Sequence, residues 1–139
     1  MKIITHDGIF HADEVFAVAL LNIFLVDSMS IPVTRTRNPK LIEQAIDDPN
    51  TFVLDVGGIF DQDRLAFDHH QVLSMKPTNI LILNWLFYNN PSDELKMVYP
   101  FLLMFMKGIA EWDINKNQSI INMRNIIPIP AKCTFYSAH

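Results

Sequence analysis

The chain has 139 residues, half of them apolar and 19% charged, which excludes a disordered protein and suits one domain better than two. Its net charge of -4 excludes a general attraction to nucleic acid, although a local basic pocket stays open. The single cysteine, Cys133, excludes a disulfide framework and a thiolate zinc cluster. No signal-peptide pattern is visible, and the apolar runs 15–26 and 97–110 are too short to span a bilayer. We therefore expect a soluble, intracellular protein without a membrane partner.

The segments up to residue 56 alternate between strand and helix patterns. Strands are predicted over 2–5, 31–36 and 51–56, and helices over 15–26 and 39–47. Asp13 and Glu14 suit the first turn of the earlier helix, and Pro39 suits the first turn of the later one. This order predicts an α/β fold with a doubly wound parallel sheet and flanking helices.

The rest of the chain is predicted to be mainly helical. Short strands are expected at 59–60 and 65–67, on either side of a turn. A helix is expected from 79 to about 88 with Thr78 as its N-cap, followed by a helix over 93–112 that bends at Pro100. The sequence contains no repeats, low-complexity tracts or flexible linkers.

Polar side chains follow each strand of the predicted sheet. His6 and His11 follow the first strand, Arg37 the second, and Asp55 ends the third. Ligands bind outside the carboxyl ends of the strands in such sheets, so these side chains are expected to share one edge. Asp68, His69 and His70 come shortly afterwards in the chain. Together these residues predict a site at that edge.

The ligand set is sufficient for two divalent metal ions: His6, His11, Asp13, Asp55, Asp68, His69 and His70. Two ions about 3.5–4 Å apart need a bridging group, and Asp55 is the best candidate because a strand end holds its side chain rigidly. Such a pair of ions acidifies a shared water and clamps a phosphoryl group during in-line attack. Nitrogen and oxygen ligands without thiolates favour Mn²⁺, with Mg²⁺ and Co²⁺ as alternatives.

A structural interpretation of the same residues stays open. His6 would then cap a backbone group, Asp13 and Glu14 would be ordinary first-turn acids, and Asp55 would cap the turn that follows. Each of these explanations is sound for one residue alone. The metal site is favoured because all of them would have to hold together at adjacent strand ends.

Four motifs, in this order, resemble one known family. They are residues 6–14 (HDGIFHADE), 35–39 (RTRNP), 55–58 (DVGG) and 67–71 (FDHHQ). They resemble the melanocyte-proliferating-gene family, an exonuclease branch related to the DHH phosphoesterases, over about residues 1–75. The resemblance implies a doubly wound sheet and a metal-dependent 3′-5′ exonuclease acting on RNA, whereas older labels imply a metal-dependent protein hydrolase.

The resemblance also implies a role for each matching residue. Six residues are implied as metal ligands, with Asp55 bridging: His6, His11, Asp13, Asp55, His69 and Asp113. His70 is implied to contact the substrate phosphate, and Asp68 and Glu14 to support the ligands. Arg35 and Arg37 are expected to bind substrate phosphate, because the guanidinium group offers two N–H donors that match two phosphate oxygens. An equally weighted alternative is that the two arginines are structural or simply solvated.

We therefore expect a divalent-metal-dependent phosphodiesterase of the 3′-5′ exonuclease type, acting on single-stranded RNA or nucleotides. Residues 1–139 are expected to form a single DHH-like metal-binding domain, with the C-terminal substrate domain of the family largely absent. An exposed apolar surface would then indicate a homodimer or a missing partner domain. Two alternatives stay open: a non-catalytic metal- or nucleotide-binding module, and a metal-dependent amide hydrolase.

Overall fold

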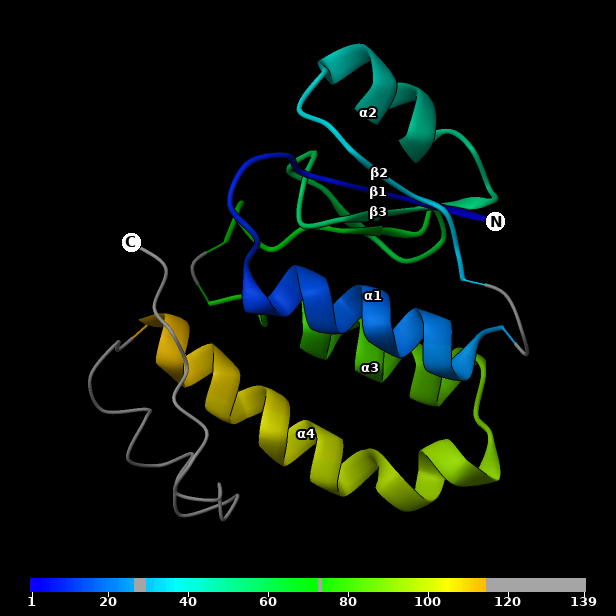
Figure 1. Ribbon diagram of the computed structural model, residues 1–139, viewed down its shortest axis with the longest axis vertical. Helices are drawn as coiled ribbons and strands as arrows, with labels where there is room; N and C mark the ends of the chain where they lie inside the picture. The colour runs from blue at the N-terminus through cyan, green and yellow to red at the C-terminus, as the bar shows by residue number, and fades with distance from the viewer. Residues whose placement is uncertain (27–29, 73, 115–139) are drawn as a thin grey trace.

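A five-stranded sheet in the order β2-β1-β3-β5-β4 forms the centre of the N-terminal half (Figure 1). Its strands are β1 (Lys2–Thr5), β2 (Val33–Arg35), β3 (Thr51–Leu54), β4 (Phe60–Asp61) and β5 (Ala66–Phe67). Parallel pairing joins β1 to β2 and to β3, and joins β3 to β5. The computed structural model describes residues 1–26, 30–72 and 74–114, without the side chains of 111–114.

Helices cover both faces of this sheet (Figure 1). They are α1 (Ala12–Phe24), α2 (Pro39–Ile46), α3 (Thr78–Asn89) and α4 (Asp93–Ile114). α2 lies on one face, α1 and α3 lie on the other, and α4 packs beneath α1 and α3. This arrangement confirms the predicted α/β fold with helices on both sides of a largely parallel sheet.

The central strand β3 explains why two separate cores exist. Phe52 and Leu54 belong to the larger cluster, which they share with α1, α3 and α4. Val53 belongs to the smaller cluster, with Ile42 and Ile46 of α2. Successive side chains of a strand point to opposite faces, so a strand covered on both sides is apolar at every position.

The edge strand β4 is the one departure from parallel pairing within the described sheet. It runs antiparallel to β5, with Phe60 opposite Phe67. A tight turn joins the two strands, in which Leu65 N–H donates to Gln62 O over 3.2 Å. A connection this short permits only an antiparallel pair, because a parallel pair needs a crossover of a dozen residues or more.

Two elements near the site begin at positions that the sequence did not predict. α1 begins at Ala12, after extended His11, rather than at residue 15, and Asp13 and Glu14 lie in its first turn as predicted. β2 is shorter than predicted because Pro32 has no amide hydrogen and the Ile31 N–H donates to the Asn22 side chain over 2.7 Å.

The two C-terminal helices also differ in detail from the prediction. Thr78 is the first residue of α3 rather than its N-cap, a position held by Pro77. α4 continues through Pro100 to Ile114, and Ser92 Oγ accepts a hydrogen bond from Leu95 N–H at its start. Within the described residues, none of the helices is both long and apolar enough to cross a membrane.

Candidate metal centre

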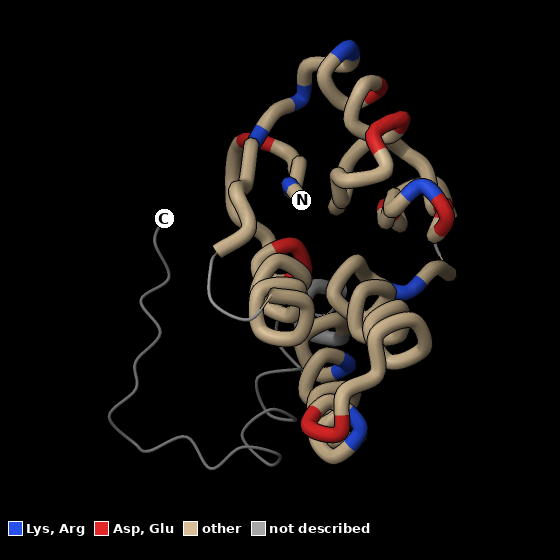
Figure 2. The backbone as a smooth tube through the Cα atoms, turned by 90° about the vertical axis from the view of Figure 1, so that its right-hand side faces the viewer, with Lys and Arg blue, Asp and Glu red and all other residues tan. Residues whose placement is uncertain are grey.

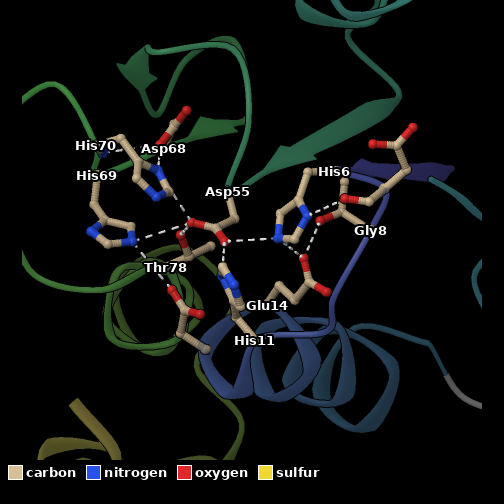
Figure 3. A network of polar contacts seen from close by, with 12 residues as sticks. His6, Gly8, His11, Glu14, Asp55, Asp68, His69, His70 and Thr78 are labelled. Carbon is tan, nitrogen blue, oxygen red and sulfur yellow. Dashed lines mark hydrogen bonds and ion pairs between the residues drawn. The ribbon is translucent and has the colours of Figure 1, made fainter. Parts of the chain in front are cut away.

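Asp55 lies at the centre of the polar residues that the sheet edge brings together (Figure 3). It follows β3 directly, is 3% exposed, and its N–H still donates to Phe67 O over 3.0 Å. Its φ of 57° lies in the left-handed region, which costs an L-residue about 1–2 kcal/mol. A buried carboxylate held in an unfavourable backbone conformation is typical of functional sites.

The two carboxylate oxygens of Asp55 face different imidazoles (Figure 3). Oδ2 lies 3.3 Å from His6 Nε2 and 3.9 Å from His11 Nδ1. Oδ1 lies 3.2 Å from His69 Nε2 and 3.6 Å from His70 Nδ1. In each set, one candidate ligand atom per residue lies within 4.8 Å of the others. A carboxylate shared by two donor sets is the arrangement expected of a bridging ligand.

Two buried polar atoms test whether a cation fits between these groups. Neither His6 Nε2 nor Asp55 Oδ2 forms a well-directed hydrogen bond with a described residue, although they lie only 3.3 Å apart and the Glu14 carboxylate also contacts His6 Nε2. Leaving buried polar atoms unpaired costs about 1–3 kcal/mol each. A divalent cation bound by both atoms would remove that cost, and imidazole and carboxylate are suitable donors for it. The residues present therefore fit a divalent metal ion.

His69 stands between two carboxylates. Its Nε2 lies 3.3 Å from Asp13 Oδ2, which α1 supplies, and 3.2 Å from Asp55 Oδ1. The hydrogen bonds to Asp13 and Asp55 raise the pKa of His69 to about 10. Burial alone would raise the pKa of Asp13, but the hydrogen bond and charge of His69 outweigh it and lower that pKa. A positive charge is therefore strongly favoured at this position.

Glu14 is almost completely buried beside His6. Its Oε2 contacts His6 Nε2 and accepts a hydrogen bond from Thr5 Oγ1 over 3.1 Å. Its Oε1 lies 3.3 Å from an Nη of Arg35, the last residue of β2. Glu14 thus joins two strand ends to the predicted ligand His6, a position that suits the supporting role predicted for it.

Asp68 fixes the ring of His70. Asp68 Oδ1 accepts a hydrogen bond from His70 N–H and lies 2.7 Å from His70 Nδ1, while Oδ2 accepts from Gly58 N–H over 2.7 Å. Burial alone would raise the pKa of Asp68, but these hydrogen bonds outweigh it and lower the pKa. The His70 side chain is 57% exposed against 24% for His69, which suits contact with a bound molecule.

The two predicted phosphate-binding arginines have different surroundings. Arg35 is largely covered, donates to Gly8 O over 3.2 Å and pairs with Glu14. Arg37 is 65% exposed, pairs with Asp7 over 3.0 Å, and has an Nη 3.4 Å from His6 Nδ1. Both guanidinium groups therefore lie at the same edge as the imidazoles.

Asp113, the predicted ligand from the C-terminal half, belongs to the last turn of α4. Its side chain lies outside the described residues, as does Cys133. Its prediction as a ligand therefore stays a prediction.

Thr78 is a site residue that the sequence did not reveal. It is fully buried, and its hydroxyl lies 3.2 Å from both Asp55 Oδ1 and Phe67 O. Because one hydroxyl carries one hydrogen, it donates to one of these acceptors at a time. A threonine at a helix start predicts an N-cap, and no local pattern connects it with an aspartate 23 positions earlier.

Comparisons with known proteins match the segment that carries most of these site residues to one family. Residues 2–78 match the family model MYG1_exonuc, described as an uncharacterised protein family (UPF0160). A MYG1 protein of Chlamydia trachomatis is 51% identical over 69 residues, covering 49% of this chain and 22% of that protein. The MYG1 exonucleases of Bos taurus and Homo sapiens are 43% and 40% identical over 70 residues, each covering 50% of this chain and 17% of the relative. The alignments thus span about a fifth of these relatives, and no solved structure matches significantly.

Proposed function

The chain belongs to the MYG1_exonuc family (UPF0160), and on that premise we propose that it carries the metal-binding part of a nuclease-type hydrolase. Two relatives bear the name MYG1 exonuclease, which supports this reaction class. One structural observation carries the proposal for this chain: Asp55 directs one carboxylate oxygen to each of two imidazole sets. A site of that form suits phosphodiester hydrolysis with two divalent ions.

The proposed ligands divide into two sets around Asp55. His6 and His11 complete the set at Oδ2, and His69 belongs to the set at Oδ1, where Asp13 enters through its oxygen 3.3 Å from His69 Nε2. Divalent ions held there, Mn²⁺ foremost, would supply Lewis-acid activation of water and neutralise charge on the phosphate. Thr78 keeps Oδ1 oriented, because its hydroxyl is within hydrogen-bond distance of that oxygen.

The proposed substrate is the 3′ end of single-stranded RNA, or a nucleotide. His70 and Arg37 are assigned to the non-bridging phosphate oxygens, since both are more than half exposed at the edge that carries the ligands. Arg37 presents a guanidinium fork that matches phosphate geometry. Arg35 is assigned to orientation, because Gly8 O and Glu14 already engage its Nη.

The test combines metal content with hydrolysis by the full chain. We expect the wild-type protein to bind Mn²⁺ and to release mononucleotides from the 3′ end of single-stranded RNA. Asp55→Ala should lose both the ions and the activity, because both ligand sets lose their shared carboxylate. Asp63→Ala is the matched control, since Asp63 is an exposed carboxylate in the turn between β4 and β5.

Three other results would replace the proposal. Undiminished activity of Asp55→Ala would refute the role of the shared carboxylate. Tight Mn²⁺ binding without hydrolysis of RNA, nucleotides or peptides would indicate a non-catalytic binding module. Cleavage of peptides but not of RNA by the same sample would indicate an amide hydrolase.

A further inference from the structure

Phe10 is an exposed aromatic side chain beside the candidate metal centre. It lies in the loop between β1 and α1, directly before His11, and is 66% exposed. A single exposed apolar side chain is ordinary on a protein surface. Phe10 differs from its neighbour Ile9, which is 82% exposed, because the guanidinium carbon of Arg35 lies 3.6 Å from its ring centroid.

Arg35 gives the Phe10 ring a fixed support. An Nη of Arg35 donates to Gly8 O over 3.2 Å and pairs with Glu14 Oε1 over 3.3 Å. Glu14 in turn contacts the predicted ligand His6. The ring is therefore joined to the site by successive side-chain contacts, with a guanidinium near its centroid and most of its surface open to solvent.

The negative overall charge of the protein makes an aromatic contact important for binding a nucleotide. Lys and Arg positions are scattered over the described backbone rather than gathered in one band (Figure 2), and the net charge is -4. Affinity for a nucleotide must then come from local contacts at the site. Base stacking on an aromatic side chain contributes about 1–3 kcal/mol per base and tolerates any base, because every base has a π-face.

We propose that the Phe10 ring, supported by Arg35, is a stacking platform for the nucleobase of the nucleotide whose phosphate binds at the metal centre. The proposal rests on the proposed function and narrows its substrate to phosphates that carry an unpaired base. The link between ring and site runs through Arg35, which contacts the ring and pairs with Glu14, and Glu14 contacts the predicted ligand His6. Single-stranded ends present such bases, whereas bases within a duplex are stacked on one another.

The experiment compares two ligands that share a phosphate and differ in the base. Binding of adenosine 5′-monophosphate and of ribose 5-phosphate to the Mn²⁺-loaded full chain is measured by calorimetry. We expect the wild-type protein to bind adenosine 5′-monophosphate more tightly. Phe10→Ala should weaken that binding about tenfold while leaving ribose 5-phosphate binding unchanged.

Two further variants separate stacking from simple apolar contact. Phe10→Trp should keep the preference for adenosine 5′-monophosphate, because tryptophan offers a larger π-face. Phe10→Leu should lose the preference, although its side chain is apolar and of similar size. Ile9→Ala is the matched control, since it removes the neighbouring exposed side chain of the same loop and should change neither ligand.

Equal weakening of both ligands by Phe10→Ala would overturn the proposal, because the ring would then only position Arg35. Equal affinity of the wild-type protein for both ligands would also overturn it. A failure of the proposed function is distinguishable, since calorimetry requires no turnover. If the protein binds adenosine 5′-monophosphate through Phe10 but hydrolyses no phosphodiester, the stacking proposal stands and the proposed nuclease activity is refuted.

Discussion

The carboxyl edge of the sheet and the layer formed by α3 and α4 bury different kinds of side chains. At the edge, His6, Glu14 and Asp55 are at most 3% exposed and polar. In the helical layer, Leu86 and Leu95 are fully buried and apolar. A buried polar atom needs a partner at hydrogen-bond or metal distance, whereas a buried apolar group needs only matching volume. The edge therefore depends on the distances and directions between polar atoms, whereas the helical layer depends on filled volume.

The family match ends close to the boundary between the sheet and the helical layer. It covers residues 2–78, which include the sheet, α1 and α2 but only the first residue of α3. Beyond it, α4 exposes Met97 and Phe101, which are 70% and 69% accessible. The described part of the chain thus joins a family-specific polar edge to helices whose contribution is mainly apolar packing.

The largest effect is expected from the helical layer, on stability alone. Leu86→Ala should lower the free energy of unfolding by about 2–5 kcal/mol, because Leu86 is fully buried and leaves a cavity. The folded fraction should bind Mn²⁺ with unchanged stoichiometry. Urea unfolding and metal analysis of the same sample check both expectations.

Two further variants serve as comparisons for Leu86→Ala. Ile82→Val, at another fully buried position of α3, should cost only about 0.5–1.5 kcal/mol and keeps the experiment informative if Leu86→Ala fails to fold. Phe101→Ala, at an exposed position of α4, should change stability by no more than about 0.5 kcal/mol. A loss of Mn²⁺ binding in the folded Ile82→Val protein would show that the two regions are not independent.

An intermediate effect is expected from pH, and it belongs to the polar edge. In the metal-free protein Asp13 and Asp55 raise the pKa of His69 from 6.5 to about 10. Folding therefore favours the protonated imidazole, so its contribution to stability is complete below about pH 6.5 and is lost as pH rises through about 10. Urea unfolding of the chelator-treated protein between pH 7 and 10.5 measures this loss.

His69→Gln is the control for that measurement, because glutamine does not titrate. The variant should be less stable than the wild type near pH 7, and the difference should shrink as pH approaches 10. Parallel pH profiles for the two proteins would contradict the coupling of His69 to the two carboxylates.

The smallest effect is expected at Thr78, where the helical layer reaches the polar edge. Thr78→Val keeps the shape of the side chain and removes the hydroxyl that lies 3.2 Å from Asp55 Oδ1. We expect a loss of about 1 kcal/mol in stability and about tenfold weaker Mn²⁺ binding, measured by urea unfolding and calorimetry. Thr78→Ser should retain both properties. If Thr78→Val is destabilised but binds Mn²⁺ with unchanged affinity, the hydroxyl contributes to stability and not to metal binding.

Much of the fold followed from local patterns. The segment 2–5, with Ile3 and Ile4 at its centre, forms β1, and Pro39 begins α2 as predicted, because these preferences depend on neighbouring residues only. The direction of β4 and the early start of α1 were not predicted. The first depends on a turn in which Leu65 has a φ of 53°, and the second on the extended conformation of His11.

The amino-acid sequence by itself determined the order of strands and helices and the fold class. It also predicted that His6, His11, Asp55 and His69 lie at one edge of the sheet. That was possible because parallel strands end at the same edge of a sheet, whatever the side-chain details. Only the tertiary structure decided that Asp55 divides its oxygens between two imidazole sets, that Thr78 contacts it, and that Arg35 supports Phe10. Such contacts join residues far apart in the chain, and their distances depend on how helices and strands pack, which no local pattern specifies.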